Sequence, residues 1–286
     1  MEHKRPTIVA VVGPTASGKT AKAVELALER NGEVISVDSR QVYRMLNVGT
    51  EKISTDEMRG VTHHLIDIRD PEETYSAADF VEDATKLINE IIARGKLPIL
   101  AGGTHFYIDA LINGLPADTP PNPKLRALLE ARNTDDLFAE LQTQDPRRAE
   151  HVDPKNRRRV VRALEIVAAR GTVPERTTKP CTYEIEWVVL DPSRDLLRER
   201  LNQREMAKFP RGLVDEVRRV RAYLVEKVGQ EAAERRLDEF GLEYRIVGEY
   251  LRGEREESSL LPTLSSKLWQ YAKHQKKWLR KLAPQT

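Results

Sequence analysis

The feature that most constrains the fold of this chain is a strand-like run joined to a helix by a short loop bounded by glycines. Residues 7–12 are apolar or β-branched throughout, which is typical of a strand buried in a parallel sheet. Residues 13–20 are GPTASGKT and match the pattern G-x-x-x-x-G-K-[ST] at every fixed position, and residues 19–29 then have helical composition. In this setting backbone N–H groups and the helix N-terminus can surround a phosphate.

The predicted phosphate loop consists of Gly13, Pro14, Thr15, Ala16, Ser17, Gly18, Lys19 and Thr20. Lys19 places a mobile cation on the phosphates, and Thr20 can be a ligand of Mg²⁺, which we expect as the cofactor. The pattern predicts phosphate binding. It leaves open whether ATP is the ligand and whether phosphoryl transfer is the reaction.

Two further buried strands are predicted at residues 33–37 and 97–101, with an amphipathic helix at residues 77–93 between them. Strands and helices that alternate in this way are typical of a parallel sheet with right-handed crossovers. The sequence therefore predicts an α/β fold, a P-loop NTPase-like parallel sheet flanked by helices, with an inserted helical domain.

The chain changes character after Gly114, where prolines cluster between residues 116 and 123. A polar helical pattern follows to about residue 170, residues 185–190 return to strand character, and residues 195–281 are helical with breaks near Pro210 and Gly253. We accordingly predict a P-loop core at 1–115, a helical insertion domain at 116–180, and a return to the core with C-terminal helices at 181–286.

Composition excludes several classes of protein. No apolar run approaches the roughly 18 residues that span a bilayer, and the N-terminus lacks signal-peptide anatomy, so we expect a cytoplasmic protein with no membrane contact. Cys181 is the only cysteine, which excludes an internal disulfide framework and a cysteine zinc site. His63 and His64 have no partner at metal-binding spacing, and we expect them to be structural.

Basic residues are clustered although the net charge is only +2. Arg157, Arg158, Arg159 and Arg162 lie in one short segment, and residues 267–281 carry lysines and arginines with no acidic residue among them. Such clusters suit the phosphate backbone of a nucleic acid, and a solvated helix face is the alternative interpretation.

Polar residues follow two of the predicted strands. Asp38 comes directly after the strand at 33–37, and Gly102, Gly103 and Thr104 follow the strand at 97–101. Ligands of parallel sheets lie at this carboxyl edge. A carboxylate there is a Mg²⁺ ligand, a general base, or only a cap of the next helix.

The sequence resembles the tRNA dimethylallyltransferase family in a series of blocks that occur in family order. These blocks are GPTASGKT (13–20), SVDSRQVYR (36–44), GVTHHLID (60–67), AGGTHFYIDALINGL (101–115), RRVVRALE (158–165), GLVDEV (212–217) and QYAKHQKKWLR (270–280). The resemblance implies a reaction in which the exocyclic amine of the adenine 3′ of the anticodon displaces diphosphate from dimethylallyl diphosphate. It also implies tRNA as partner, bound by the insertion domain through its anticodon arm, and we expect a monomer.

The resemblance further implies roles for individual residues. Asp38 matches the family's general base, Thr15 a residue near the bridging oxygen of the diphosphate, and Arg204 an arginine on the diphosphate. The positions that match tRNA contacts are Asp38, Ser39, Arg40, Gln41, Thr104, Arg158, Arg159 and Arg162.

Three positions depart from the family pattern. Arg158 stands where glutamine is usual, Glu243 where glycine is usual, and Lys208 where methionine is usual. The lone Cys181 excludes the C-terminal zinc finger of eukaryotic members, so the form is bacterial-like.

Three other functions share some of these features. A small-molecule P-loop kinase would have the same loop and sheet but no need of basic surfaces. A nucleotide-dependent RNA-binding switch would need no carboxylate beside the loop, and an adenylate isopentenyltransferase would need no helical insertion. The acceptor that receives the prenyl group discriminates among them.

Overall fold

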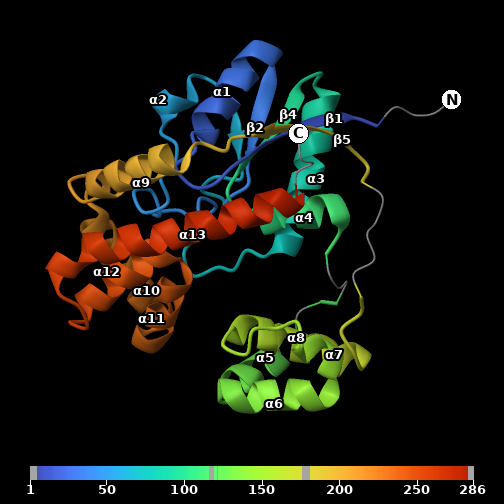
Figure 1. Ribbon diagram of the computed structural model, residues 1–286, viewed down its shortest axis with the longest axis vertical. Coiled ribbons are helices and arrows are strands. Elements are labelled where there is room, and N and C mark those ends of the chain that lie inside the picture. The colour runs from blue at the N-terminus through green and yellow to red at the C-terminus, as the bar shows by residue number, and fades with distance from the viewer. Residues whose placement is uncertain (1–4, 116–118, 121, 176–180, 283–286) are drawn as a thin grey trace. The chain divides into compact units, whose positions relative to one another are not determined.

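The computed structural model describes residues 5–115, 119–120, 122–175 and 181–282. These residues form two compact units, one made of residues 1–112 together with 181–286 and the other of residues 113–180. The larger unit, unit 1, contains the sheet, and the smaller one, unit 2, is helical (Figure 1).

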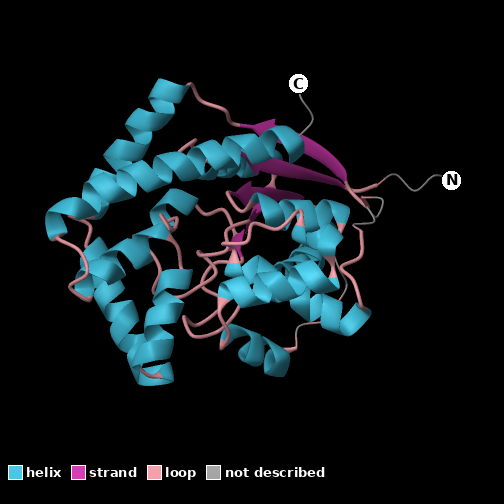
Figure 2. Cartoon of the chain, turned by 60° about the horizontal axis from the view of Figure 1, so that its bottom comes forward, coloured by secondary structure: helices cyan, strands magenta, loops and turns pink. Residues whose placement is uncertain are grey.

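Unit 1 is built on a parallel sheet of five strands with the order β3-β2-β4-β1-β5. The strands, which lie side by side in Figure 2, are β1 (Thr7–Val12), β2 (Gly32–Ser36), β3 (His63–His64), β4 (Leu97–Gly102) and β5 (Glu184–Val189). This arrangement confirms the predicted α/β fold with a parallel sheet flanked by helices. Strand β5 pairs with β1 over its whole length, as expected for a chain that rejoins the sheet after an insertion.

Strand β1 is buried on both faces, which explains its continuous apolar sequence. Ile8, Ala10 and Val12 belong to one apolar cluster, whereas Val9 and Val11 belong to another that includes side chains of the first helix. The strand that leads into the phosphate loop is therefore held between two layers of side chains.

Helices cover the sheet and extend the larger unit. They are α1 (Lys19–Arg30), α2 (Thr55–Met58), α3 (Ala77–Ala93), α4 (His105–Asn113), α9 (Arg194–Lys208), α10 (Leu213–Val228), α11 (Gln230–Glu239), α12 (Leu242–Leu251), the 3₁₀ turn η1 (Glu257–Ser259) and α13 (Leu260–Leu282). Two breaks in this C-terminal region were not predicted, at Gly229 and Gly241, where both glycines have positive φ angles. Helix α2 and strand β3, which are four and two residues long, are too short to give a periodic sequence pattern and were not predicted.

The described residues of unit 2 form the helices α5 (Pro123–Glu130), α6 (Thr134–Gln144), α7 (Pro146–Ala149) and α8 (Arg157–Arg170). They surround an apolar cluster of their own, in which Leu137, Leu141 and Val160 are fully buried. Asn122, Asn133, Asp145 and Asn156 cap the four helix N-termini through their side chains. Within the described ranges of the chain, no helix is long and apolar enough to cross a membrane.

Candidate active site

The phosphate loop needs glycine at both ends of its pattern, for two different reasons. A Cβ atom at Gly13 would lie 2.6 Å from the Leu190 carbonyl oxygen, so any side chain there would displace the chain that follows β5. Gly18, directly before α1, has a φ angle of 93°, which favours glycine. Ala16 also adopts a positive φ of 62°, and the loop curls as its sequence predicts.

Lys19 lies at the start of α1 and donates a hydrogen bond of 2.7 Å from Nζ to the Pro14 carbonyl oxygen. Burial lowers the pKa of this ammonium group to about 7, and the nearby charge of Arg204 lowers it further, while Asp38 opposes the shift. A lysine with this pKa gains a proton readily when an anion arrives. Thr20 follows on the exposed side of the helix start.

Asp38 lies just beyond β2, as predicted, and its carboxylate closes a local turn. Oδ1 accepts hydrogen bonds from the backbone N–H groups of Arg40 (2.8 Å) and Gln41 (3.3 Å). Asp38 thus closes a turn and does not cap a helix, since the next helix, α2, begins only at Thr55. The same carboxylate also lines a cavity over this edge of the sheet. Burial raises its pKa, against the lowering effect of the two backbone bonds, so the group is a stronger proton acceptor than an exposed aspartate.

The loop after β4 is fastened to the Asp38 segment. Thr104 Oγ1 accepts a hydrogen bond of 3.0 Å from the Ser39 backbone N–H, and Thr104 N–H donates to the Val37 carbonyl oxygen at 3.1 Å. A Cβ at Gly102 would lie 2.0 Å from that same carbonyl oxygen, so only glycine fits. The structure therefore brings Thr104 and Ser39 together beside Asp38.

A cavity of about 810 Å³ opens over the carboxyl edge of the sheet. Its lining includes Thr15, Ala16, Gly18, Lys19, Thr20, Asp38, Ser39, Arg40, Gln41, Thr104 and Arg204, all of which the sequence analysis singled out. Gly13, Pro14 and Ser17 belong to the loop but not to this lining. The phosphate loop, the segment 38–41, Thr104 and Arg204, which are separate in the sequence, thus share one cavity.

Gln41 is held by the protein itself. Its Oε1 accepts a hydrogen bond from the Ser36 hydroxyl, and its Nε2 donates to the carbonyl oxygens of Thr50 and Glu51, each at 3.2 Å. The amide therefore supports the part of the cavity wall formed by residues 49–53. This structural role was not predicted for Gln41, which was expected to contact tRNA.

Glu216 supports the same wall and was missed, although it lies in the quoted block GLVDEV. It is 2% exposed, and its carboxylate accepts hydrogen bonds from the backbone N–H groups of Asn47, Val48 and Gly49 and from the Tyr244 hydroxyl. An acidic residue at a position where a helix faces the core is the signal that could have identified it.

Two of the family departures, Lys208 and Glu243, are partners of each other. Lys208 is fully buried, and its Nζ lies 2.6 Å from Glu243 Oε1, 2.9 Å from Glu205 Oε1 and 3.3 Å from the Gly49 carbonyl oxygen. Glu205 in turn lies 3.4 Å from Arg204 Nε. A chain of buried charges therefore connects Arg204, which lines the cavity, with α12.

In unit 2 the predicted arginines have different surroundings. Arg158 and Arg159 are exposed at the start of α8. Arg162 instead donates to the Thr119 carbonyl oxygen at 2.6 Å and to Glu165 Oε2 at 3.4 Å. Glu165 also holds Arg126 through two hydrogen bonds. Arg162 thus contributes to the packing of its own unit.

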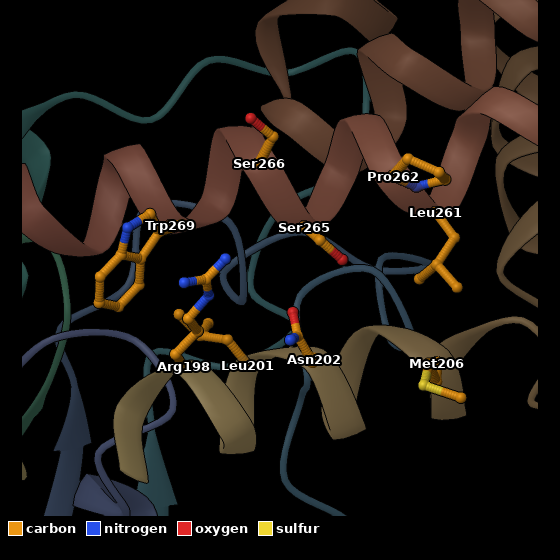
Figure 3. Close-up of a pocket in the computed structure, with 9 residues that line it drawn as sticks. All are labelled: Arg198, Leu201, Asn202, Met206, Leu261, Pro262, Ser265, Ser266 and Trp269. Carbon is orange, nitrogen blue, oxygen red and sulfur yellow. The ribbon is translucent and has the colours of Figure 1, made fainter. Parts of the chain in front are cut away.

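A second cavity, of about 470 Å³, lies between α9 and α13, and the sequence analysis did not anticipate it. Figure 3 shows Arg198 of α9 extending toward α13 beside Trp269, with Met206 further along the same helix. Leu201 and Leu268 are buried where these two helices pack, and Trp269 is partly buried against the same core. This packing fixes α9 and hence the position of Arg204.

Comparison with known proteins identifies the class to which this fold and site belong. A family profile described as "IPP transferase" matches residues 41–282, and the chain belongs to the IPP transferase family. A protein of Thermomicrobium roseum named tRNA dimethylallyltransferase is 44% identical, over 98% of this chain and 85% of that protein.

Solved structures agree with this assignment. The full-length tRNA isopentenylpyrophosphate transferase from Bacillus halodurans is similar with a TM-score of 0.68 and 39% identity, over 98% of this chain and 88% of that one. A eukaryotic dimethylallyltransferase studied in action on tRNA is similar with a TM-score of 0.78 and 27% identity, over 96% of this chain and 70% of that one.

Proposed function

We propose that this protein transfers a dimethylallyl group from dimethylallyl diphosphate to the exocyclic amine of the adenine immediately 3′ of the anticodon in tRNA. The observation that carries the proposal is the cavity over the sheet edge, which is lined by Lys19, Arg204 and the phosphate loop together with Asp38. Membership of the IPP transferase family supports the same reaction.

The chemistry requires stabilisation of a leaving group more than activation of a bond. As the allylic C–O bond breaks, its electron pair passes to the bridging oxygen of the diphosphate. Lys19, Arg204 and the N-terminus of α1 lie where this growing negative charge would be stabilised. The amine nitrogen of adenine forms the new C–N bond with its lone pair.

The amine must also lose a proton, and Asp38 is our candidate acceptor. Burial raises the pKa of its carboxyl group, so the protonated product state is less costly than for an exposed aspartate. The two backbone bonds to Oδ1 hold the carboxylate in one orientation during the transfer. Thr15 lines the same cavity, in agreement with a place near the bridging oxygen.

Mg²⁺ is the cofactor that we propose, and the chemistry of the local donors fits it. Thr20 offers an exposed hydroxyl at the start of α1, and no group of three or more acidic, histidine or cysteine side chains in the part of the chain that the structure describes could hold a metal by itself. Mg²⁺ commonly takes most of its ligands from phosphate oxygens and water. Thr20 would thus hold the ion together with the diphosphate, and the ion would neutralise part of the charge of the leaving group.

The tRNA partner is proposed from charge and from the relatives' names. Arg158 and Arg159 are exposed cations suited to backbone phosphates of an anticodon arm. The target adenine must leave its stack for the amine to be reached. We propose that the protein acts as a monomer.

One labelling experiment tests the function. The protein is incubated with Mg²⁺ and dimethylallyl diphosphate labelled in the prenyl group, with tRNA, AMP or ATP as separate acceptors. We expect label only in tRNA, on the adenine 3′ of the anticodon. Label in AMP or ATP would instead indicate an adenylate isopentenyltransferase, and transfer of phosphate from ATP to a small molecule would indicate a kinase.

A further inference from the structure

Gln275 of α13 is a buried polar residue in direct contact with two loops of the cavity. Its side chain is 5% exposed, although it lies on a helix with many exposed charges. Its Oε1 accepts a hydrogen bond of 2.8 Å from the Thr15 backbone N–H, and its Nε2 donates one of 3.0 Å to the Gly103 carbonyl oxygen. Leu268 and Tyr271 lie on the same face of α13, so this helix forms a wall of the cavity.

The bond to Thr15 acts on the peptide unit that also anchors Lys19. The Pro14 carbonyl and the Thr15 N–H belong to one trans peptide and point in opposite directions. Gln275 holds the N–H end at 2.8 Å, and Lys19 Nζ holds the carbonyl end at 2.7 Å. Rotation of this peptide would break both bonds, so Gln275 helps to fix where Lys19 rests.

The bond to Gly103 extends the same restraint toward Asp38. Gly103 directly precedes Thr104, which accepts the hydrogen bond from the Ser39 backbone N–H beside Asp38. A Cβ at Gly103 would lie 2.9 Å from Gln275 Nε2, so the amide fits closely against this loop. Lys276, the next residue, bonds to Asp191 at 2.6 Å and to the Pro192 carbonyl oxygen, which ties α13 to the segment after β5.

We propose that Gln275 is a positioning residue that fixes the phosphate loop against the loop carrying Thr104, and thereby holds the diphosphate site and Asp38 in register. The inference rests on the proposed function for its link to prenyl transfer. Its link to diphosphate binding rests on the geometry alone.

Only a side chain that accepts and donates at once satisfies both loops. An ionised glutamate at position 275 could accept from Thr15 N–H but would face the Gly103 carbonyl oxygen with a second acceptor. It would also place a negative charge near the diphosphate. A protonated glutamate can donate to Gly103 again and resembles glutamine, so Gln275→Glu should have a defect that depends on pH.

The experiment compares Gln275→Glu with the wild type between pH 5.5 and 8.5. It measures the kcat for prenyl transfer, the KM for dimethylallyl diphosphate and the KM for tRNA. At pH 8.5 we expect the KM for the donor to rise about 10- to 100-fold, the scale of an unsatisfied buried hydrogen-bonding group. The ratio of mutant to wild-type KM should fall toward one as the pH falls. Dividing by the wild-type profile corrects for the titration of Lys19 and Asp38, which both proteins contain. The KM for tRNA should change little.

Gln270→Glu is the matched control, because it makes the same change on an exposed position of the same helix. It should leave the donor KM unchanged at every pH. Gln275→Ala provides a second variant, and calorimetric binding of inorganic diphosphate provides a measurement that needs no prenyl transfer. Both Gln275 variants should bind diphosphate at least about tenfold more weakly than the wild type at pH 8.5.

Two results would overturn the inference. One is a ratio of mutant to wild-type donor KM that does not vary with pH in Gln275→Glu. If that variant also had a lower melting temperature, the role of Gln275 would be purely structural. The other is wild-type affinity for diphosphate in both variants. If the wild type transfers no prenyl group to tRNA, the proposed function fails, and the diphosphate measurement still decides the role of Gln275.

Discussion

Replacing Lys208 with methionine should destabilise the larger unit by about 3–5 kcal/mol, the scale for removing one partner of a buried ion pair. The substitution conserves the length and apolar stem of the side chain but removes the ammonium group. Lys208 is fully buried and serves two carboxylates, Glu205 at 2.9 Å and Glu243 at 2.6 Å.

The size of the effect follows from what remains behind. Glu205 is also fully buried, and its Oε2 has no hydrogen-bond partner among the described residues. Without Lys208, its nearest cation is Arg204, whose Nε lies 3.4 Å from Oε1. Burial already raises the pKa of Glu205, with Lys208 as the main opposing charge. The substitution should therefore raise that pKa further.

The sign of the pH dependence follows from this shift. A carboxyl group whose folded-state pKa lies above its unfolded value adds stability at low pH and loses it as the pH rises through the folded-state pKa. The deficit of Lys208→Met relative to the wild type should therefore be largest at neutral and alkaline pH and shrink as the solution is acidified.

Thermal unfolding followed by circular dichroism measures the effect. For a domain of this size 1 kcal/mol corresponds to about 2–4 °C, so a drop of roughly 10 °C is expected. Lys267→Met, on an exposed face of α13, should change stability by less than about 0.5 kcal/mol. Glu243→Gly in the Lys208→Met background should recover part of the loss, because one of the two uncompensated carboxylates is gone.

A Lys208→Met protein as stable as the wild type would refute the argument that this ammonium compensates a buried carboxylate, Glu205, and a partly buried one, Glu243. Strict additivity of the Lys208→Met and Glu243→Gly effects would refute the coupling between them, for which about 0.5–3 kcal/mol is expected between residues in contact.

Three further predictions concern the site and its RNA partner. Asp38→Asn keeps an oxygen that can accept from the Arg40 and Gln41 N–H groups but removes the base. The kcat for prenyl transfer should therefore fall about 10²-fold or more, with tRNA affinity unchanged. Near wild-type turnover would show that Asp38 only closes a turn. The pKa of Lys19 is lowered to about 7, so diphosphate binding measured by calorimetry should weaken by up to about tenfold per pH unit above 7. Binding should be accompanied by proton uptake, and Lys19→Met should abolish that uptake. A Lys19→Met pH profile identical to that of the wild type would contradict this prediction. The double variant Arg158→Ala, Arg159→Ala should flatten the salt dependence of tRNA binding by roughly one to two units of slope. Arg162→Ala should instead mainly lower the stability of unit 2. An unchanged slope in the double variant would place the RNA-binding surface on the basic face of α13.

The sheet and the phosphate site were predictable because their signals are local. Each feature can be recognised from a few consecutive residues: the apolar run at 7–12, the glycine-bounded pattern at 13–20 and the acidic residue after the second strand. The structure places the predicted Lys19, Asp38 and Thr104 on one cavity, since parallel strands end at the same edge.

The supporting network was not predictable in the same way. Lys208, Glu243 and Gln275 lie on helices whose patterns suggest a solvated surface. The contact between Lys208 and Glu243 spans 35 residues of sequence, and that between Gln275 and Thr15 spans 260. A charged or amide side chain is ordinarily exposed, and only its tertiary contacts show that it is buried. For Lys208 and Glu243 the one available hint was that both depart from the family pattern, and their contact explains why they do so together.

The sheet order has a consequence for how the protein is made. Strand β1 leads into the phosphate loop, yet its neighbour β5 starts only at Glu184, so during synthesis one edge of β1 stays unpaired until residues 184–189 have emerged. Unpaired edges invite wrong pairing, and domains generally form as units in the order of translation. Unit 2 has an apolar core of its own and can fold within this interval, which keeps the connection between residues 112 and 181 compact. The nascent chain therefore completes the pairing of β1 late, and substitutions that slow the folding of unit 2 should increase aggregation of newly made protein even where they leave the finished enzyme unchanged.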